Sequence, residues 1–352
     1  MKTLEQLTTS ITSIPTATAW YLADLSEAKG RQQLFTRQSP RALKALREHA
    51  LIESTISSNR IEGVEIDAKR VRDVLMGQRA LRDRNEEEVQ GYRDALQLTH
   101  EREAKLAVTE KVICQLHRLS RGEIWDAGKY KEKDVDIIEL LPGGGRKIRF
   151  KTVPARKTPD AMKELVSLGE DIARDGNPHP LIALAAFNLD FLCIHPFRDG
   201  NGRVSRLLLL LQCYHAGLEV GRYISLERII EQNKQRYYET IEQSSQGWHE
   251  RKHNPWPYIN YLLYILKTAY AEFEERFGQV KPARGEKREA VNRAIRAQTT
   301  EFTLADLRRA CPGVSVDTIR LHLKQSRLRG EVLCVKKGRN ATWEKAKFTQ
   351  SR

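Results

Sequence analysis

Apolar positions along the chain recur mostly at helical spacing, and the longest apolar segment lies near the middle. Residues 181–194 are almost wholly apolar, and their length and Ala/Leu content favour a buried helix over a strand. A second apolar stretch, 207–214, predicts another buried helix. Between them, Pro196 cannot continue a helix and the Gly-Asn-Gly run at 200–202 favours positive φ. We therefore expect a sharp turn here, with the next helix starting at about Gly202.

Segments with period-two alternation are few, which limits the expected amount of sheet. Residues 135–150 carry β-branched alternation on both sides of Pro142–Gly145, a pattern typical of a β-hairpin. Strong helix formers dominate elsewhere, for example over 42–56. The predicted fold class is mainly α, with a short β-hairpin in the helical body and a separate small domain at the C-terminus.

That C-terminal domain is expected to follow a linker at 278–285. Thr303 with Asp306 is typical of a capping box, and Ser315 can cap the helix after it. The predicted elements are helices 287–298, 303–309 and 316–328, a turn at Pro312-Gly313, strands 332–335 and 341–343, and a basic turn at 336–340.

The third helix of this domain, 316–328, presents a basic face made of Arg320, Lys324 and Arg327. Its apolar residues are expected to face inward or lie at the edge, and they are Ile319, Leu321, Leu323 and Leu328. By its order of elements alone, the domain resembles a winged helix-turn-helix. That resemblance implies DNA binding, with this helix in a major groove. A protein-interaction or dimerisation domain is the alternative.

Positive charge is concentrated in the same region. The chain of 352 residues has a net charge of +14, and residues 281–352 hold 18 Lys and Arg against 7 Asp and Glu. Because phosphate contacts supply most non-specific affinity for nucleic acid, this excess slightly favours DNA as the partner of residues 281–352.

Cysteine usage and hydropathy point to the cytoplasm. Five scattered cysteines include no Cys-x-x-Cys, and three of them (Cys193, Cys213 and Cys334) lie in apolar patterns typical of reduced, buried thiols. The N-terminus has no apolar signal segment, and no run approaches the ~20 apolar residues of a membrane span. We expect a cytoplasmic protein without a membrane partner, divided into parts 1–95, 96–277 and 278–352.

The turn between the two apolar helices holds the main candidate chemistry. Residues 195–206 read His-Pro-Phe-Arg-Asp-Gly-Asn-Gly-Arg-Val-Ser-Arg. The free N–H groups of the glycine loop and the helix start form an anion site, and Arg203 and Arg206 share one face of the first turn. Asp199 beside a polyphosphate indicates Mg²⁺, and His195 is the candidate general base. Each of these residues alone is explained equally well by an ordinary turn or a solvated helix face, but their occurrence together within twelve residues argues against coincidence.

This run matches His-x-Phe-x-[Asp/Glu]-Gly-Asn-Gly-Arg-x-x-Arg and resembles the Fic (filamentation induced by cAMP) family. The resemblance implies a protein adenylyltransferase that moves AMP from ATP to a Ser, Thr or Tyr hydroxyl of a target protein. It implies His195 as the base and Asp199 as the Mg²⁺ ligand. The remaining implied roles are phosphate binding by Gly200, Asn201, Gly202, Arg203 and Arg206, and anchoring of the loop by Phe197.

A second motif lies upstream, at the end of the predicted helix 42–56. Ser58 and Glu62 are spaced i, i+4, and Gly63 is placed as a helix cap. Alone this is an ordinary helix end. Beside a Fic core it resembles the family's inhibitory [Ser/Thr]-x-x-x-Glu-[Gly/Asn]. That resemblance implies that Glu62 pairs with Arg206 and misplaces ATP, either within one chain or across a homodimer. In some relatives the same glutamate also helps remove AMP from the target.

Two further segments are implied to line the nucleotide site. The family interpretation of the hairpin is a flap that covers the nucleotide, with Val135, Ile137 and Ile138 near the ligand. Tyr237 and Tyr238 would lie beside the adenine, although core tyrosines explain them equally. Relatives often carry an asparagine seven residues after this pair, where this chain has Ser245.

Three alternatives compete with this interpretation. Residues 249–253 fit the zinc protease pattern His-Glu-x-x-His, but Gly247 and Pro255 leave too short a helix, which indicates a chance match in a surface loop. Some Fic-like proteins transfer other groups, such as phosphocholine. The alternative from another class is a DNA-binding regulator whose Fic core senses nucleotide without turnover.

Overall fold

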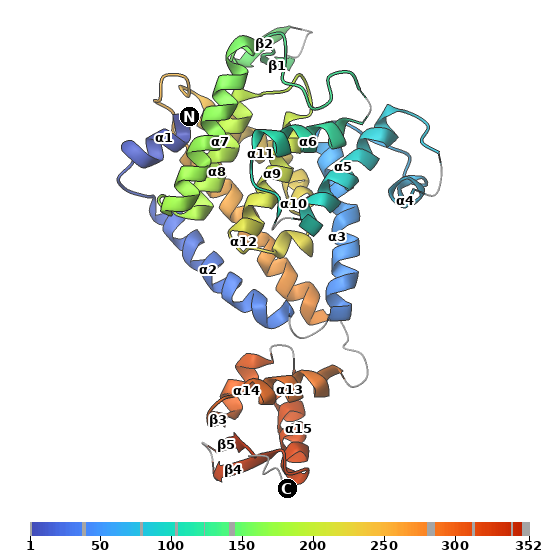
Figure 1. The fold of residues 1–352 in the computed structure, drawn as a ribbon, viewed down its shortest axis with the longest axis vertical. Helices are drawn as coiled ribbons and strands as arrows, with labels where there is room; N and C mark the ends of the chain where they lie inside the picture. The colour runs from blue at the N-terminus through green and yellow to red at the C-terminus, as the bar shows by residue number, and fades with distance from the viewer. Residues whose placement is uncertain are drawn as a thin grey trace. The chain divides into compact units, whose positions relative to one another are not determined.

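The computed structural model describes residues 2–36, 40–77, 80–102, 105–122, 124–140, 145–279, 286–311, 314–338 and 341–346. The chain forms two compact units (Figure 1). The first consists of residues 1–27 and 46–271, and the second consists of residues 28–45 and 272–352. None of the helices in the described ranges is long and apolar enough to cross a membrane.

Helices make up most of the first unit, as the sequence predicts. They are α1 (Lys2–Thr9), α2 (Thr16–Thr36), α3 (Pro40–Ile61), α4 (Val71–Leu75), α5 (Arg84–Arg102), α6 (Glu110–Arg121), α7 (Thr158–Asp175), α8 (Pro180–Ile194), α9 (Asn201–His215), α10 (Leu226–Gln232), α11 (Lys234–Ser245) and α12 (Trp256–Gln279), of which α2, α3 and α12 continue into the second unit. Helix α8 packs against α1, α7 and α9, and is buried along nearly its whole length. The predicted buried helix at 181–194 is therefore confirmed.

One buried polar residue of α8, Asn188, joins this helix to two other elements. The Asn188 side chain donates to the Ser205 carbonyl (2.7 Å) and accepts from the Tyr258 hydroxyl (2.6 Å). Because buried polar groups are costly unless paired, these bonds fix α9 and α12 against α8. The loop between α8 and α9 is thus held by rigid helices on both sides.

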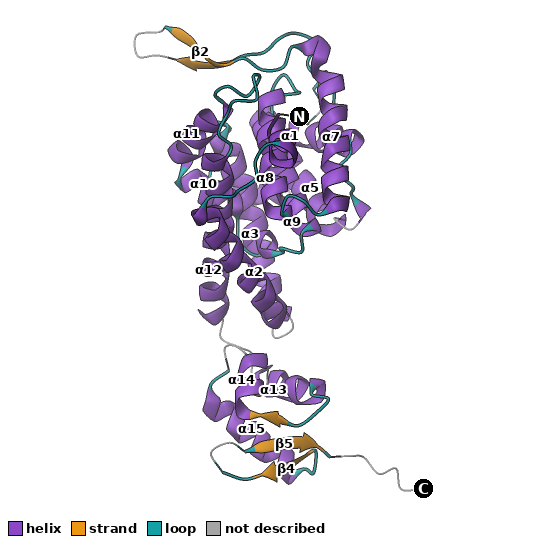
Figure 2. Cartoon of the chain, turned by 90° about the vertical axis from the view of Figure 1, so that its left-hand side faces the viewer, coloured by secondary structure: helices purple, strands orange, loops and turns teal. Residues whose placement is uncertain are grey.

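The predicted hairpin is confirmed as β1 (Ile137–Leu140) and β2 (Arg146–Phe150), which are antiparallel and paired Ile138 to Ile148. It stands out from the helices (Figure 2). The tip at 141–144 lies outside the described residues. Helix α3 is longer than predicted: it continues to Ile61, so Ser58 lies in its last turn and only Glu62 and Gly63 follow it.

The second unit holds α13 (Glu286–Ala297), β3 (Phe302–Thr303), α14 (Leu304–Ala310), α15 (Val316–Leu328), β4 (Val332–Lys336) and β5 (Thr342–Lys345). The predicted helices and two strands are confirmed, as are the Thr303–Asp306 capping box and the Ser315 cap. The third strand, β3, was not predicted, and it pairs with β5 to give the order β3-β5-β4. Residues 280–285 of the expected linker, the turn at 312–313 and residues 339–340 lie outside the described residues.

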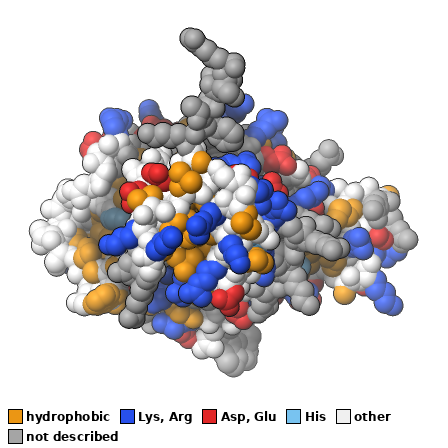
Figure 3. Space-filling model, turned by 90° about the horizontal axis from the view of Figure 1, so that it is seen from below, with side chains coloured by type: hydrophobic (Ala, Val, Ile, Leu, Met, Phe, Trp, Pro, Cys, Tyr) orange, Lys and Arg blue, Asp and Glu red, His pale blue; other side chains and the backbone are white. Residues whose placement is uncertain are grey.

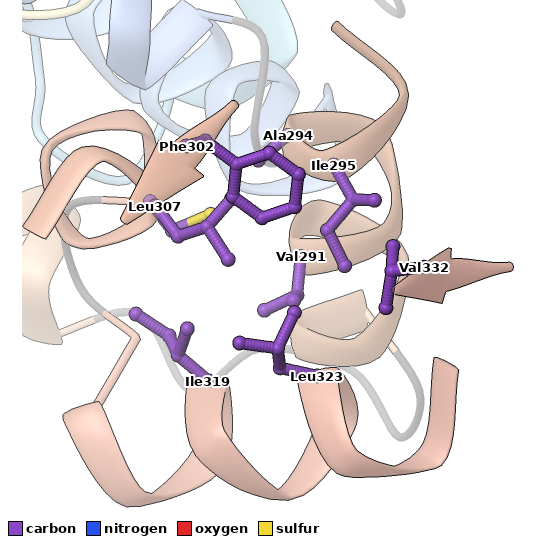
Figure 4. Close-up of a cluster of buried hydrophobic side chains, with 9 residues drawn as sticks. Val291, Ala294, Ile295, Phe302, Leu307, Ile319, Leu323 and Val332 are labelled. Carbon is purple, nitrogen blue, oxygen red and sulfur yellow. The ribbon is translucent and has the colours of Figure 1, made fainter. Parts of the chain in front are cut away.

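This sheet and its helices enclose a core of their own (Figure 4). Ile319 and Leu323 of α15 are buried in it with Phe302 and Val332. Leu321 and Leu328 do not join them: they are 53% and 78% exposed, so their expected inward or edge position is wrong. Both lie off the buried stripe of α15, because a helix turns ~100° per residue and 321 and 328 fall on the solvent side of 319 and 323.

All five cysteines are free. Cys193 and Cys213 are buried as predicted, whereas Cys334 is only partly buried and Cys311 is buried in the core of the second unit. Cys334 differs because it lies in β4, of whose described residues Val332 alone is fully buried.

Candidate active site

The loop after α8 is fixed by its own asparagine and by an aromatic anchor. Asn201 pairs with the backbone of Phe197 in both directions, accepting from its N–H (2.9 Å) and donating to its carbonyl (2.8 Å). Phe197 is fully buried and stacks on His117 with ring centres 3.8 Å apart. The Asn201 side chain therefore shapes the loop, and Phe197 is the buried anchor that the sequence predicts.

His195 ends α8 in a left-handed backbone conformation, with φ of 53°. Few residues other than glycine adopt this conformation, so the surrounding structure must impose it. Burial lowers the pKa of His195 to about 4, the charge of Lys131 acts in the same direction, and Glu62 and Asp199 oppose both. The imidazole is therefore neutral at pH 7 and able to accept a proton.

Asp199 of the motif loop has a side chain that is 55% exposed. One carboxylate oxygen accepts from the Gly200 N–H (2.6 Å), and the other lies 2.9 Å from Arg121 Nη1. Burial would raise the pKa of this carboxyl, but Arg121 and Arg203 outweigh that effect and lower it. Asp199 is thus a carboxylate at neutral pH, and its partner is a cationic side chain of α6.

The two arginines of the motif have different surroundings. Arg203 is 1% exposed, and its Nη1 donates to Glu88 of α5 (2.8 Å) and to the Ser120 carbonyl (3.2 Å). Glu88 also binds Arg121 (2.6 Å). In this structure Arg203 thus joins a buried ion network with Glu88 and Arg121, and the phosphate contact that the sequence indicates for it stays a prediction.

Arg206 is bound by the upstream motif, as the resemblance implies. Its Nε donates to the Ser58 hydroxyl (2.8 Å), and its Nη2 donates to the Ser58 carbonyl and to Glu62 Oε1 (both 2.9 Å). Burial would lower the pKa of Arg206, but Glu62 raises it, so the pair is ionic. These contacts form within one chain.

The Glu62 carboxylate also lies against the start of α9. A β-carbon built on Gly202 would collide with Glu62 Oε1, so only glycine allows this approach. The N-terminus of a helix attracts anions through its free N–H groups and its dipole. Glu62 therefore lies at the start of α9, where the sequence predicts an anion site, and Arg206 lies beside it.

Beside this pair lies a cavity of about 250 Å³. His195, Gly202, Glu62, Tyr237 and Tyr238 line it together with Ile137 of the hairpin. Tyr237 is buried, while the Tyr238 hydroxyl donates to the Ile61 carbonyl (3.3 Å). Ser245 lies on the cavity wall. The two other hairpin candidates are not among its lining residues: Val135 accepts from Thr152 through its carbonyl, and Ile138 is 49% exposed.

Several residues around the site carry no recognisable sequence signal. Glu88, Arg121 and Lys131 come from α5, α6 and the segment after α6, and they reach the loop only through folding. Arg149 of β2 lines the cavity and pairs with Glu242 of α11 (2.5 Å). In the sequence alone, charged residues at these positions are typical of a solvent-exposed surface.

The His-Glu-x-x-His match at 249–253 does not form a zinc site. These residues lie in turns and coil rather than on a helix. His249 Nε2 bonds the Lys151 carbonyl (2.7 Å), and His253 Nε2 bonds the Thr3 hydroxyl (2.9 Å). The two rings therefore serve separate contacts.

Residues 107–213, which span α6 to most of α9, match the model of the Fic/DOC family. The chain carries a Fic domain. Curated relatives include "Protein adenylyltransferase Fic" of Nematostella vectensis, 25% identical over 216 residues that cover 58% of this chain and 45% of that protein. Its namesake in Drosophila willistoni is 27% identical over 148 residues, which are 41% of this chain and 26% of the relative. The chain thus spans less than half the length of either relative.

Solved structures share the fold. A Fic family protein from Desulfovibrio desulfuricans G20 superposes with a TM-score of 0.61 at 23% identity, over 97% of this chain and 98% of that one. A Fic domain containing signaling protein from Bacteroides thetaiotaomicron VPI-5482 also gives 0.61, at 20% identity, over 73% of this chain and 98% of that one. At these identities the likeness supports the fold of this chain alone.

Proposed function

We propose that this Fic protein is a protein adenylyltransferase that transfers AMP from ATP to a Ser, Thr or Tyr hydroxyl of a target protein, itself included. The observation that carries the proposal is the cavity in which a neutral histidine faces an anion site. The name of the curated relatives supports the same reaction.

In this proposal His195 takes the proton of the attacking hydroxyl, and the new bond forms between that oxygen and the α-phosphorus. The bond from the α-phosphorus to the bridging oxygen of diphosphate breaks. The N–H groups at the start of α9 and the Arg206 guanidinium hold the polyphosphate oxygens. Tyr237, Tyr238 and Ile137 bound the space for the adenosine.

The residues present fit a divalent cation that arrives with its nucleotide. Asp199 is half-exposed and ionised, whereas groups of three or more His, Cys, Asp or Glu able to hold a metal are absent among the described residues. Mg²⁺ is suited to such a place, because it takes one or two carboxylates and completes its shell with phosphates and water. When bound there, it would neutralise charge on the phosphates.

We also propose that Glu62 inhibits this reaction. It occupies the anion site at Gly202 and engages Arg206, so a nucleotide must displace it or bind with its phosphates out of place. A misplacement of about 1 Å can cost roughly a hundredfold in rate.

Intact-mass analysis after incubation with ATP and Mg²⁺, with and without cell lysate, tests both proposals. Glu62→Gly should raise the yield of AMP adducts roughly a hundredfold, and adding His195→Ala should abolish it. Glu65→Gly is the matched control, because Glu65 is an exposed glutamate just after Glu62. Adducts that persist without His195, or that are absent from every sample, would contradict the transferase.

A second activity of the same site would be removal of AMP from the modified protein. Glu62 lines the cavity with His195 and its side chain is 24% exposed, so its carboxylate has access to a water molecule there. Release of AMP from purified AMP-modified target, measured by mass, should require both residues. Release that survives Glu62→Gly would argue against this activity.

For the second unit we propose a winged helix-turn-helix that binds DNA. Its elements follow the order helix–strand–helix–helix–strand–strand, and the strands form a three-stranded sheet. This is the topology that a winged helix-turn-helix requires. Arg320, Lys324 and Arg327 are exposed on α15, and Lys and Arg side chains lie among hydrophobic ones on the surface shown in Figure 3. We also propose that the chain is divided into three parts, which are residues 1–95, 96–277 and 278–352.

Salt-dependent binding to a fluorescent duplex tests this role. Replacing the three α15 cations by alanine should weaken binding and reduce its salt dependence, because fewer phosphates are neutralised. Alanine at the exposed Lys111, Lys129 and Lys133 removes equal charge from the other unit and should have little effect. DNA binding without AMP transfer by Glu62→Gly would favour a DNA-binding regulator with a nucleotide-sensing core.

A further inference from the structure

The carbonyl groups on either side of His195 both accept hydrogen bonds from one residue, Lys131. The backbone N–H of Lys131 donates to the Pro196 carbonyl (2.9 Å), which follows His195. The Lys131 ammonium donates to the Ile194 carbonyl (3.1 Å), which precedes it. A single residue from another segment thus bonds both sides of the left-handed turn.

The ammonium itself is held firmly. Lys131 is 5% exposed, and its Nζ also donates to the Thr152 hydroxyl (2.7 Å), which in turn donates to the Val135 carbonyl (2.6 Å). Thr152 follows β2 and Val135 precedes β1, so the same bonds join the turn to the base of the hairpin. A buried ammonium with these partners is built into the site rather than solvated beside it.

We propose that Lys131 is a positioning residue for His195: it holds the strained turn from both sides and sets a positive charge beside the imidazole. This inference rests on the proposed transferase, in which His195 is the base. The His195 N–H also donates to the Phe191 carbonyl (2.9 Å) and closes the end of α8, whereas the two bonds from Lys131 tie the turn to another segment. Without those two bonds the left-handed φ of 53° loses part of its support. The strain would then relax and move the ring.

The charge acts on the proton equilibrium of the base. Lys131 is the cation that lowers the pKa of His195, and Glu62 and Asp199 are the anions that raise it. Burial lowers the pKa of Lys131 itself to about 8, against the charges of Asp134 and Asp136. At pH 7 the ammonium is therefore still charged, and it disfavours a second positive charge on His195.

The test compares Lys131→Met, which removes the charge and the donor, with Lys131→Arg, which keeps both. Lys133→Met is the matched control, because Lys133 is exposed two residues along the same segment. The imidazole signals of His195 are followed by NMR across pH. The midpoint should move toward the ordinary value in Lys131→Met, stay low in Lys131→Arg and be unchanged in Lys133→Met.

Activity gives the second readout, measured as AMP transfer in the Glu62→Gly background. Lys131→Met should lose roughly tenfold or more in kcat at pH 7, part of the 10²–10⁴-fold that a positioned base contributes. The acid limb of its pH profile should move to higher pH, and Lys131→Arg should restore much of both. Because a purely structural lysine would not shift the limb, the profile separates the two roles.

Thr152→Val keeps the inference testable where Lys131→Met does not fold. It removes one anchor of the ammonium, and both readouts should move in the same direction by a smaller amount. If the His195 midpoint in Lys131→Met, or in Thr152→Val where Lys131→Met does not fold, equals that in Lys133→Met, the role of Lys131 is overturned. The NMR arm needs no AMP transfer, so absence of transfer with an intact midpoint shift would count against the proposed reaction only.

Discussion

Asp199, the candidate metal ligand, forms an ion pair with an arginine. Arg121 Nη1 lies 2.9 Å from one of its carboxylate oxygens, and Arg121 is itself anchored on Glu88. A cation that binds Asp199 must therefore displace this guanidinium or share the carboxylate with it. Arg121 is buried but the Asp199 side chain is 55% exposed to solvent, so the strength of the pair is on the order of 1 kcal/mol.

Removing that competitor should tighten metal binding. We expect Arg121→Ala to bind Mn²⁺ about fivefold more tightly in the presence of ADP, because roughly 1 kcal/mol of competing ion pair is lost. Electron paramagnetic resonance of free Mn²⁺ measures this directly. Arg84→Ala is the control, since Arg84 bonds the same oxygen of Glu88 (2.9 Å). Weaker binding by Arg121→Ala would mean that Arg121 orients Asp199 for the metal instead.

Residue identities in the 195–206 motif were readable from the sequence, but their partners were not. The i, i+3 spacing puts Arg203 and Arg206 at the start of one helix, yet Arg203 turns to Glu88 and Arg206 to Glu62. The second pairing was expected because a motif carried it. The first was not, because Glu88 is one of three consecutive glutamates on α5, of which both Glu86 and Glu88 are buried, and nothing in that run marks the one that binds Arg203.

Among the elements, α1 receives the cap of its N-terminus from a buried carboxylate of α8. Asp190 of α8 is fully buried and accepts from the N–H groups of Thr3 (2.9 Å) and Leu4 (3.0 Å) and from Trp248 Nε1 (2.6 Å). The first N–H groups of a helix have no partners within it, so Asp190 supplies the cap from outside. Burial raises the pKa of Asp190, and these hydrogen bonds oppose that rise.

Asp190→Ala should therefore cost about 3 kcal/mol in the free energy of unfolding, because it leaves three buried donors without their acceptor. The amides of Thr3 and Leu4 should also exchange faster with solvent. Urea unfolding and hydrogen exchange measure the two effects. Asp171→Ala, at an exposed carboxylate of α7, should change stability by less than about 0.5 kcal/mol. Equal losses in the two variants would contradict this account of α1.

Elements with strong periodicity or caps were predicted to within a few residues. Helices α8 and α15 and the hairpin strands fall where the pattern places them. Strand β3 was missed, because two residues give no alternation to detect and the strand forms only by pairing with β5. The end of α3 was placed too early, because the polar run at 57–60 looks like a terminus, whereas Ser57, Ser58 and Asn59 are buried by the elements around them.

The first unit as a whole contains four histidines held in the neutral form. Burial is the first cause for each: it lowers the pKa of His100 to about 3 and those of His117, His195 and His253 to about 4. The residues come from α5, α6, the motif loop and the segment before α12. In an unfolded chain these histidines would be protonated near pH 6.5, whereas in the folded unit they are protonated only at about pH 4.

Acid should consequently destabilise this unit well before its carboxylates are titrated. Between pH 6.5 and 4 the unfolded state binds more protons, so stability falls as pH falls, by more than about 1.4 kcal/mol per pH unit once two or more of these histidines contribute. Urea unfolding at a series of pH values, followed by the fluorescence of the buried Trp248, measures the slope. His253→Asn should flatten it by removing one proton site. A stability profile that is flat down to pH 4 would mean that these rings are not held neutral, and the neutral base proposed at His195 would lose its support with them.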